Sequence, residues 1–209
     1  MNIVLVGIQG SGKGTLLEGL TKQFDFTVFS VGQLLREEVA TGSELGKRIK
    51  KKQDAGELVE TSIVMDALNK ALKNSSSKNA IFDGFPRNSE QAQELDKLLK
   101  VDLLIHLNLT KEVAYERILN RLTCNRCGFI SKKSENLKGC PKCGGNLVSR
   151  SDDTLESINA RFKTYENETY PLLERYRARG VVVDVDANRT PSEVLKDVLK
   201  VLNEYNNKK

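Results

Sequence analysis

The feature that most constrains the fold is the opening of the chain, where a short apolar run leads into a glycine-rich turn. Residues 3–6 read Ile-Val-Leu-Val, residues 7–15 read Gly-Ile-Gln-Gly-Ser-Gly-Lys-Gly-Thr, and helix-forming residues follow. Glycines let the backbone curl so that consecutive N–H groups point at phosphate oxygens, and a helix N-terminus and Lys13 add positive charge. We therefore expect the chain to bind a nucleoside triphosphate or a similar polyphosphate.

One position departs from the general phosphate-binding loop. A hydroxyl residue normally follows the lysine and holds Mg²⁺. Here Gly14 occupies that position, and the hydroxyl comes one residue later at Thr15. This departure argues against an ordinary GTPase or motor ATPase.

Length and charge set the remaining bounds. The 209 residues suffice for one core and a small extra lobe, and 33 Lys and Arg against 28 Asp and Glu give a net charge of +5. That excess suits an anionic ligand and is too diffuse to require nucleic acid. Without an apolar stretch of membrane-spanning length or a signal peptide, we expect a cytoplasmic protein with no membrane partner. The basic run at 47–52 is expected to be a solvated helix face rather than a polyanion-binding patch.

All four cysteines lie in two C-x-x-C-G knuckles, which is a zinc-ribbon pattern. Cys124 and Cys127 belong to the first knuckle, and Cys140 and Cys143 belong to the second. Twelve residues separate the two knuckles. Four thiolates leave no open coordination position, so we expect structural Zn²⁺, with disulfides as the alternative. Because the surrounding lobe has few apolar residues, the metal would supply much of its folding free energy.

Periodicity predicts alternating helices and strands, and hence a parallel sheet covered on both faces. Helices are expected at 34–39, 43–55, 62–72, 89–99, 111–121 and 192–202, and strands at 27–29, 80–82, 103–109 and 181–183. A long helix is predicted to begin near Asp153 or Thr154, to bend at Pro171 and to end at Gly180. The polar run 74–77 is expected to be a surface loop, and His106, inside a predicted strand, to be structural.

Several motifs converge on one family. Asp-Gly-Phe-Pro-Arg at 83–87 follows a predicted strand, so it lies at the carboxyl edge of the sheet, where ligands bind in such folds. With the 7–15 loop, Arg36 in Leu-Leu-Arg-Glu, residues 56–59 and the R-x-D-D…R run from Arg150 to Arg161, the chain closely resembles the adenylate kinases that carry a long zinc-binding lid. The resemblance extends over residues 2–202.

The resemblance implies an α/β P-loop nucleoside-monophosphate kinase fold, with a parallel five-stranded sheet flanked by helices. It divides the chain into a core at 1–29, 60–121 and 159–209, a helical monophosphate-binding insert at 30–59 and a zinc-ribbon lid at 122–158. The implied partners are ATP and AMP or ADP, in a monomer by default, although a homo-oligomer is not excluded.

The implied reaction is the Mg²⁺-dependent, reversible conversion of ATP and AMP into two ADP. The acceptor is a phosphate oxygen that is already ionised, so no general base is needed, and catalysis consists of positioning and charge neutralisation. Arginines suit this task because a guanidinium can bind phosphate oxygens bidentately. The implied catalytic residues are Lys13, Arg87, Arg121, Arg150 and Arg161.

The resemblance also assigns binding residues. Those implied for ATP are Gly10, Ser11, Gly12, Lys13, Gly14, Thr15, Arg117, Arg121, Ile130, Ser131 and Asn188. Those implied for AMP are Val31, Arg36, Glu57, Leu58, Val59, Gly84, Phe85, Pro86, Arg87, Gln91, Arg150 and Arg161. Gln91 would contact the acceptor base, and Asp83 would orient waters on Mg²⁺.

Three positions depart from the family pattern. Val31 replaces a usual threonine, Gln33 a usual aspartate, and Asn88 a common threonine, the last as in pyrimidine-monophosphate kinases. A lost hydroxyl removes one polar discriminator, so we expect AMP to be accepted with relaxed discrimination against other monophosphates. A broad or pyrimidine nucleoside-monophosphate kinase is therefore an alternative. An ATP-switched zinc-ribbon nucleic-acid-binding protein is another, although the cysteines lack interleaved aromatic and basic residues.

Overall fold

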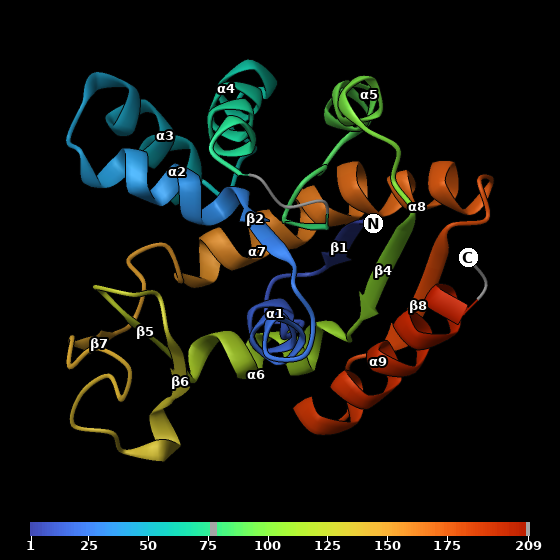
Figure 1. Ribbon diagram of the computed structural model, residues 1–209. Coiled ribbons are helices and arrows are strands. Elements are labelled where there is room, and N and C mark those ends of the chain that lie inside the picture. Colours follow the sequence, from blue (N-terminus) through green and yellow to red (C-terminus); the bar gives the residue numbers. More distant parts are fainter. Residues whose placement is uncertain (76–78, 208–209) are drawn as a thin grey trace.

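The centre of the molecule is a parallel five-stranded sheet, seen in a computed structural model that describes residues 1–75 and 79–207 (Figure 1). The strand order is β2-β3-β1-β4-β8, and every pairing is parallel. The strands are β1 (Asn2–Gly7), β2 (Thr27–Ser30), β3 (Ala80–Asp83), β4 (Leu103–Asn108) and β8 (Val182–Asp186). The predicted sheet is thus confirmed. The central strand β1 is buried on both faces, which explains its uninterrupted apolar run.

Helices cover both faces of this sheet, and each face has its own apolar cluster (Figure 1). The helices of the first cluster are α1 (Lys13–Thr21), α6 (Lys111–Leu119), α7 (Leu155–Thr164) and α9 (Pro191–Asn207). Those of the second are α2 (Val31–Ala40), α3 (Glu44–Asp54), α4 (Thr61–Lys73), α5 (Ser89–Leu98) and α8 (Tyr170–Arg177). The carboxyl ends of β1, β2 and β3 therefore meet the N-termini of α1, α2 and α5 at one edge of the sheet.

The long helix after the cysteines is interrupted rather than simply bent. A π-helical segment, Tyr165–Thr169, separates α7 from α8. Pro171 lies in the first turn of α8, where its missing N–H leaves the preceding turn without a normal α-helical donor. The predicted bend at Pro171 therefore takes the form of a π segment that ends just before it.

A second, antiparallel sheet carries the cysteines. Its order is β6-β5-β7, with β5 (Arg121–Cys124), β6 (Ile130–Lys132) and β7 (Leu147–Val148), and a short 3₁₀ turn, Lys133–Glu135, follows β6. The helix predicted at 111–121 was wrong at its end, because α6 stops at Leu119 and Arg121 begins β5 opposite Lys132. β6 and β7, with three and two residues, are too short to show a period of two, so they were not predicted.

Other differences are confined to the ends of elements. The helix predicted at 34–39 begins at Val31, and the last helix runs to Asn207 rather than 202. Of the predicted loop 74–77, residues 76 and 77 lie outside the described residues. The basic run at 47–52 is a solvated face of α3 with intrahelical ion pairs, as expected. Among the described helices, none combines the length and apolarity needed to cross a membrane.

Candidate active site

The phosphate-binding loop joins β1 to α1 at the carboxyl edge of the sheet. Gly10 and Gly12 have φ values of 87° and 89°, in the left-handed region that favours glycine. Lys13 folds back over the loop, where its Nζ donates to the carbonyl oxygens of Gly7 at 2.7 Å and Ile8 at 3.2 Å. The Lys13 ammonium group therefore ties the start of α1 back to the first residues of the loop.

Burial lowers the pKa of Lys13 to about 8, and the nearby Arg87 and Arg121 lower it further while Asp83 opposes the shift. A polyanion bound in the loop would favour the charged ammonium group. The charge that burial and the neighbouring arginines disfavour on Lys13 would thus be stabilised by a bound anion.

Asp83, at the end of β3, lies beside this lysine and has one unused carboxylate oxygen. Its Oδ2 accepts a hydrogen bond from Ser30 Oγ at 2.9 Å, whereas its Oδ1 is buried and has no partner among the described residues. A buried carboxylate oxygen without a partner is unusual. It fits a water molecule of hydrated Mg²⁺, which commonly keeps several waters and binds through few carboxylates.

The loop after β3 holds Arg87 through three hydrogen bonds. Its N–H donates to Gln91 Oε1 and its Nε to the Gly84 carbonyl, both at 2.9 Å, while its own carbonyl accepts from Thr169 Oγ1. Asn88 caps α5, because its Oδ1 accepts from the Gln91 N–H. The side chain of Asn88 thus has a helix-capping role, and its choice there does not require a pyrimidine substrate.

Arg36 extends from α2 toward the same region. Its guanidinium donates to Gln33 Oε1 at 3.0 Å, and Gln33 Nε2 donates to Glu37 at 3.1 Å. Burial lowers the pKa of Arg36, and Arg121 and Arg161 add to that shift against the opposing Asp152 and Asp83. Gln33, which departs from the family pattern, therefore orients Arg36.

Two carboxylates that follow the cysteine lobe (residues 121–148) hold Arg121 and Arg161. Arg121 donates to both oxygens of Asp153, and Arg161 donates to Asp152 and to the Gln53 carbonyl of α3. The sequence showed Asp152 and Asp153 only as part of a motif, without a role for either. Their position in the R-x-D-D motif, close to an arginine, was the one local feature that could have indicated a role in binding arginine.

Two further polar contacts around the arginines could not be predicted from the sequence. Gln9 Nε2 donates to Asp153 Oδ1 at 3.0 Å, and Arg150 Nε donates to Thr123 Oγ1 at 3.2 Å. Burial lowers the pKa of Arg150 to about 10, and the charges of Arg121 and Arg36 contribute. These contacts join residues far apart in the sequence, so no local pattern indicates them.

The site as a whole combines six cationic side chains with three carboxylates. The cations are Lys13, Arg36, Arg87, Arg121, Arg150 and Arg161, and the carboxylates are Asp83, Asp152 and Asp153. Their mutual effects on pKa place them within electrostatic range of one another. Such an excess of positive charge is stabilised by bound anions, and guanidinium groups bind phosphate bidentately.

The cysteine lobe and the helices α2 and α3 lie against this cluster. A Cβ built on Gly14 would lie 3.2 Å from Ile130 Cδ1, and Lys142 Nζ of the lobe lies 2.9 Å from Glu18 of α1. Arg161 contacts α3 through the Gln53 carbonyl. The conformation is therefore closed over the phosphate-binding loop.

Some predicted nucleotide-binding residues have protein partners of their own. Arg117 donates to the Arg189 carbonyl at 3.3 Å, the Asn188 amide contacts Thr110 and Asp186, and Glu57 pairs with Lys52. Val31 is only 3% exposed and belongs to the second apolar cluster. Their proposed contacts with nucleotide remain predictions. Ser131 Oγ, in contrast, is buried without a partner among the described residues.

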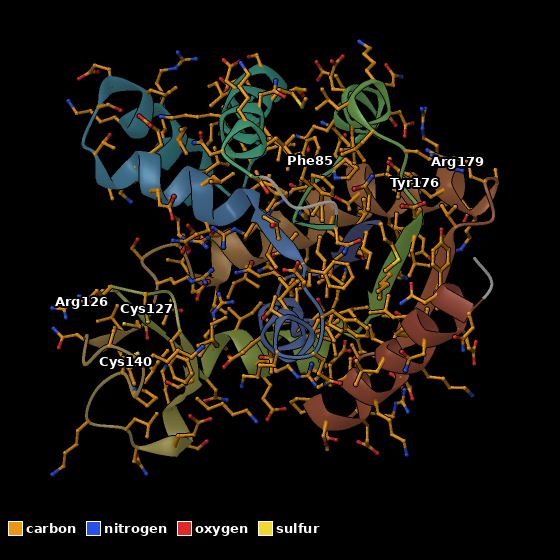
Figure 2. The ribbon with its side chains drawn as sticks, in the orientation of Figure 1. Phe85, Arg126, Cys127, Cys140, Tyr176 and Arg179 are labelled. Carbon is orange, nitrogen blue, oxygen red and sulfur yellow. The ribbon has the colours of Figure 1, made fainter. Side chains whose placement is uncertain are left out.

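The four cysteines form one cluster that could hold a metal ion. Their Sγ atoms all lie within 4.8 Å of one another, with Cys124–Cys143 and Cys127–Cys140 at 3.5 Å, and all four are free thiols in a single group. Figure 2 shows Cys127 and Cys140 in the lobe, apart from the main sheet. Tetrahedral Zn²⁺ with Zn–S bonds of about 2.3 Å requires S–S distances of about 3.8 Å. The donor set fits that ion with little movement.

His106 has only structural partners. Its ring nitrogens contact Asp184 Oδ1 at 2.6 Å and Tyr165 Oη at 2.8 Å, and the side chain is buried. Burial lowers its pKa, and the hydrogen bond to Asp184 opposes that shift. The histidine thus ties β4 to β8 and to the π segment, as a structural residue.

Comparisons with known proteins agree with this geometry. The family model described as "Adenylate kinase" matches residues 5–181. The chain is 36% identical to the adenylate kinase of Archaeoglobus fulgidus, covering 97% of this chain and 98% of that protein. It is 40% identical to the adenylate kinase of Nitrosococcus oceani, with the same coverage, and 36% identical to that of Caldanaerobacter subterraneus subsp. tengcongensis, covering 97% and 96%.

Proposed function

The chain belongs to the adenylate kinase family, and we propose that its six clustered cations carry out phosphoryl transfer from Mg·ATP to AMP. It is a nucleoside-monophosphate phosphotransferase, and the family reaction yields two ADP. The observation that carries the residue assignment is the excess of six cationic side chains over three carboxylates around the phosphate-binding loop. Two polyanions that repel each other need such an excess to come together.

On the donor side, Lys13 and the amides of residues 10–15 would bind the ATP phosphates. Arg121 and Arg150 would approach them from the lobe, and Arg117, Ile130, Ser131 and Asn188 would surround the donor base. Asp83 would orient waters of Mg²⁺, and its unpartnered Oδ1 supports that role. When bound, Mg²⁺ neutralises phosphate charge.

On the acceptor side, Arg36 and Arg87 would hold the α-phosphate of AMP. Gln33 and the 83–87 loop orient their guanidinium groups. Gln91 would contact the base, with residues 57–59 and Val31 beside it. Gln91 Oε1 already accepts from the Arg87 N–H, so the acceptor base would be read by the remaining amide hydrogens.

The transfer step requires orientation more than proton movement. The attacking phosphate oxygen is ionised, so no side chain must remove a proton, and Arg161 would stabilise the charge of the transferring group. Asp152 and Asp153 keep Arg161 and Arg121 oriented. Residues 30–59 and 122–158 would act as moving parts whose closure excludes water, which would otherwise hydrolyse ATP.

The metal proposed for the four cysteines is Zn²⁺. Four thiolates in tetrahedral reach of one point favour Zn²⁺ or an iron–sulfur centre, and the paired C-x-x-C-G knuckles favour zinc. With no open position, the ion would stabilise the lobe and take no part in the reaction.

Three residues that depart from the family pattern, Val31, Gln33 and Asn88, bear on the proposed base selectivity. Asn88 caps α5 and Gln33 orients Arg36, so both have explanations that do not involve the base. The case for relaxed selectivity therefore rests on Val31, which lacks a hydroxyl. We propose that AMP is preferred but that CMP and UMP are also phosphorylated.

The test is phosphoryl transfer from Mg·ATP to AMP, CMP, UMP and GMP, compared in wild type and Val31→Thr. Relaxed selectivity predicts measurable turnover of CMP or UMP that falls in V31T while AMP turnover is kept. Preference for AMP by several orders of magnitude in the wild type would refute relaxed selectivity. An absence of transfer to every acceptor would refute the assigned reaction.

A further inference from the structure

The π-helical segment between α7 and α8 is fixed to the protein at both of its ends. Its first residue, Tyr165, contacts His106 Nε2 through its hydroxyl at 2.8 Å. Its last residue, Thr169, donates from Oγ1 to the Arg87 carbonyl at 2.7 Å. We propose that Thr169 is a positioning residue that holds Arg87 for the acceptor phosphate, an inference that rests on the proposed role of Arg87.

The contacts of Arg87 restrict rotation of its backbone as well as of its side chain. Gln91 binds its N–H, Thr169 binds its carbonyl, and Gly84 accepts from its Nε. The two peptide groups that flank Arg87 are thus held from two elements, α5 and the π segment. A rotation of either would displace the guanidinium group at the far end of a long side chain.

The hydrogen bond of Thr169 is partly buried, with the buried side at Thr169, which makes it costly to lose. Thr169 is only 7% exposed, so water cannot easily replace its hydroxyl as a partner for the Arg87 carbonyl. Loss of this donor would leave the Arg87 carbonyl without its protein partner, which is unfavourable. The 83–87 loop would then rearrange to find another partner, and Arg87 would move with it.

The π segment fixes the direction of Thr169. The N–H of Tyr170 bonds to the carbonyl of Tyr165, five residues earlier, rather than to the residue four earlier. The wider turn shifts the register of the helix by part of a turn, and such insertions are frequent at functional sites. Tyr165 anchors this turn to β4 through His106, which Asp184 of β8 holds in turn. The position of Thr169 is therefore set by the core sheet.

The experiment compares AMP and ATP binding, each alone, in Thr169→Val, Thr169→Ser and Thr21→Val. Valine keeps the branched shape and removes the donor, whereas serine keeps the donor. Thr21 is the matched control, because its hydroxyl donates within its own helix to the Leu17 carbonyl at 3.0 Å, outside the proposed site. Equilibrium dialysis with labelled AMP or ATP measures each dissociation constant.

We expect T169V to weaken AMP binding about tenfold, the effect of a lost hydrogen bond, and to change ATP binding less than about twofold. T169S and T21V should bind both nucleotides as the wild type does. Unchanged AMP affinity in T169V, or an equal loss for ATP, would overturn the proposal. If T169V does not fold, Thr169→Ala takes its place, and failure of both to fold would show a structural role and also overturn it.

Arg87→Ala separates this inference from the proposed function. If R87A leaves AMP binding intact, the assignment of Arg87 to the acceptor phosphate is wrong and the role of Thr169 falls with it. If R87A weakens AMP binding and T169V does not, the assignment stands and only the positioning role is refuted. If R87A and T169V both weaken AMP binding and T169S binds AMP as the wild type does, the proposal is supported.

Discussion

Arg121 donates to both carboxylate oxygens of Asp153, at 2.8 and 2.7 Å, and the two side chains are only 12% and 6% exposed. Gln9 of the phosphate-binding loop also donates to Asp153. The carboxylate thus links the arginine that begins β5 to the loop at the end of β1. The orientation of Arg121 is set before any nucleotide binds.

We expect Asp153→Asn to lower the rate of phosphoryl transfer about 10- to 100-fold, the effect of losing a charge-assisted hydrogen bond of roughly 1.5–3 kcal/mol. The asparagine cannot accept from Arg121 at both positions, so the guanidinium would take several orientations. The measurement is kcat with saturating Mg·ATP and AMP. Asp96→Asn is the matched control, since Asp96 holds Arg175 and Arg179 on the surface away from the site. A similar loss of rate in both variants would contradict the prediction.

The parts of the site that the sequence predicts are those formed by one strand and the loop after it. The phosphate-binding loop and the 83–87 loop each follow a buried strand, and parallel strands bring their carboxyl ends to one edge. Their meeting therefore follows from alternation of strands and helices alone. The cysteine cluster is equally local, because each knuckle places two thiols within four residues.

The parts that the sequence does not predict are contacts between distant segments. Thr169 and Arg87 are 82 residues apart, and Gln9 and Asp153 are 144 apart. No periodicity or spacing encodes these pairs, because they depend on how α7 and the cysteine lobe pack against the core. The π segment is likewise a tertiary effect, since its residues read as an ordinary amphipathic helix in the sequence.

Lys13 leads to a pH prediction for ATP binding. Its pKa is about 8 in the free protein, and bound phosphates should raise it, so binding takes up a proton between about pH 8 and pH 10. ATP affinity should accordingly fall as pH rises through this range, by at most about tenfold per pH unit. Calorimetry at pH 9 in two buffers of different ionisation enthalpy measures the proton uptake. Equal apparent enthalpies in the two buffers would argue against it.

The same shift has a consequence for the stability of the free protein. The folded pKa lies below the ordinary value of 10.5, so the unfolded chain binds more protons between about pH 8 and pH 10.5. The contribution of Lys13 to the free energy of unfolding therefore rises with pH across this window and is least favourable below pH 8. Urea unfolding of wild type and Lys13→Met at pH 7.5 and pH 10 tests the sign. The free energy of unfolding of the wild type, relative to that of Lys13→Met, should be higher at pH 10 than at pH 7.5.

Removal of zinc should loosen the cysteine lobe before it affects the core. β6 and β7 contain three and two residues and have little buried apolar surface, whereas the main sheet has an apolar cluster on each face. The metal would therefore supply most of the stability of residues 121–148. Hydrogen exchange with and without a chelator should show faster exchange in β5–β7 and unchanged exchange in β1 and β4. Uniformly faster exchange would mean that the lobe and the core unfold together.

The ion pair between Lys142 and Glu18 should favour the closed lobe. Lys142 lies in the second cysteine knuckle and Glu18 on α1, with 2.9 Å between the charged atoms, and the hydrogen bond from Lys142 contributes most to lowering the pKa of Glu18. The side chains are 49% and 36% exposed, so the pair should contribute only about 0.2–1 kcal/mol. A double-mutant cycle with Lys142→Met and Glu18→Gln isolates this interaction.

If opening of the lobe limits turnover, both single variants should raise kcat by up to about fivefold at saturating substrate, because a weaker closed state releases product sooner. The double variant should equal either single one, and added salt should raise the wild-type kcat while leaving the variants unchanged, since exposed ion pairs are screened. Lys22→Met is the control, because Lys22 also pairs with Glu18 but within α1, at 3.4 Å, and bridges no moving part. If K22M raises kcat as much as K142M does, the effect comes from the charge on Glu18 and not from the contact between the lobe and α1.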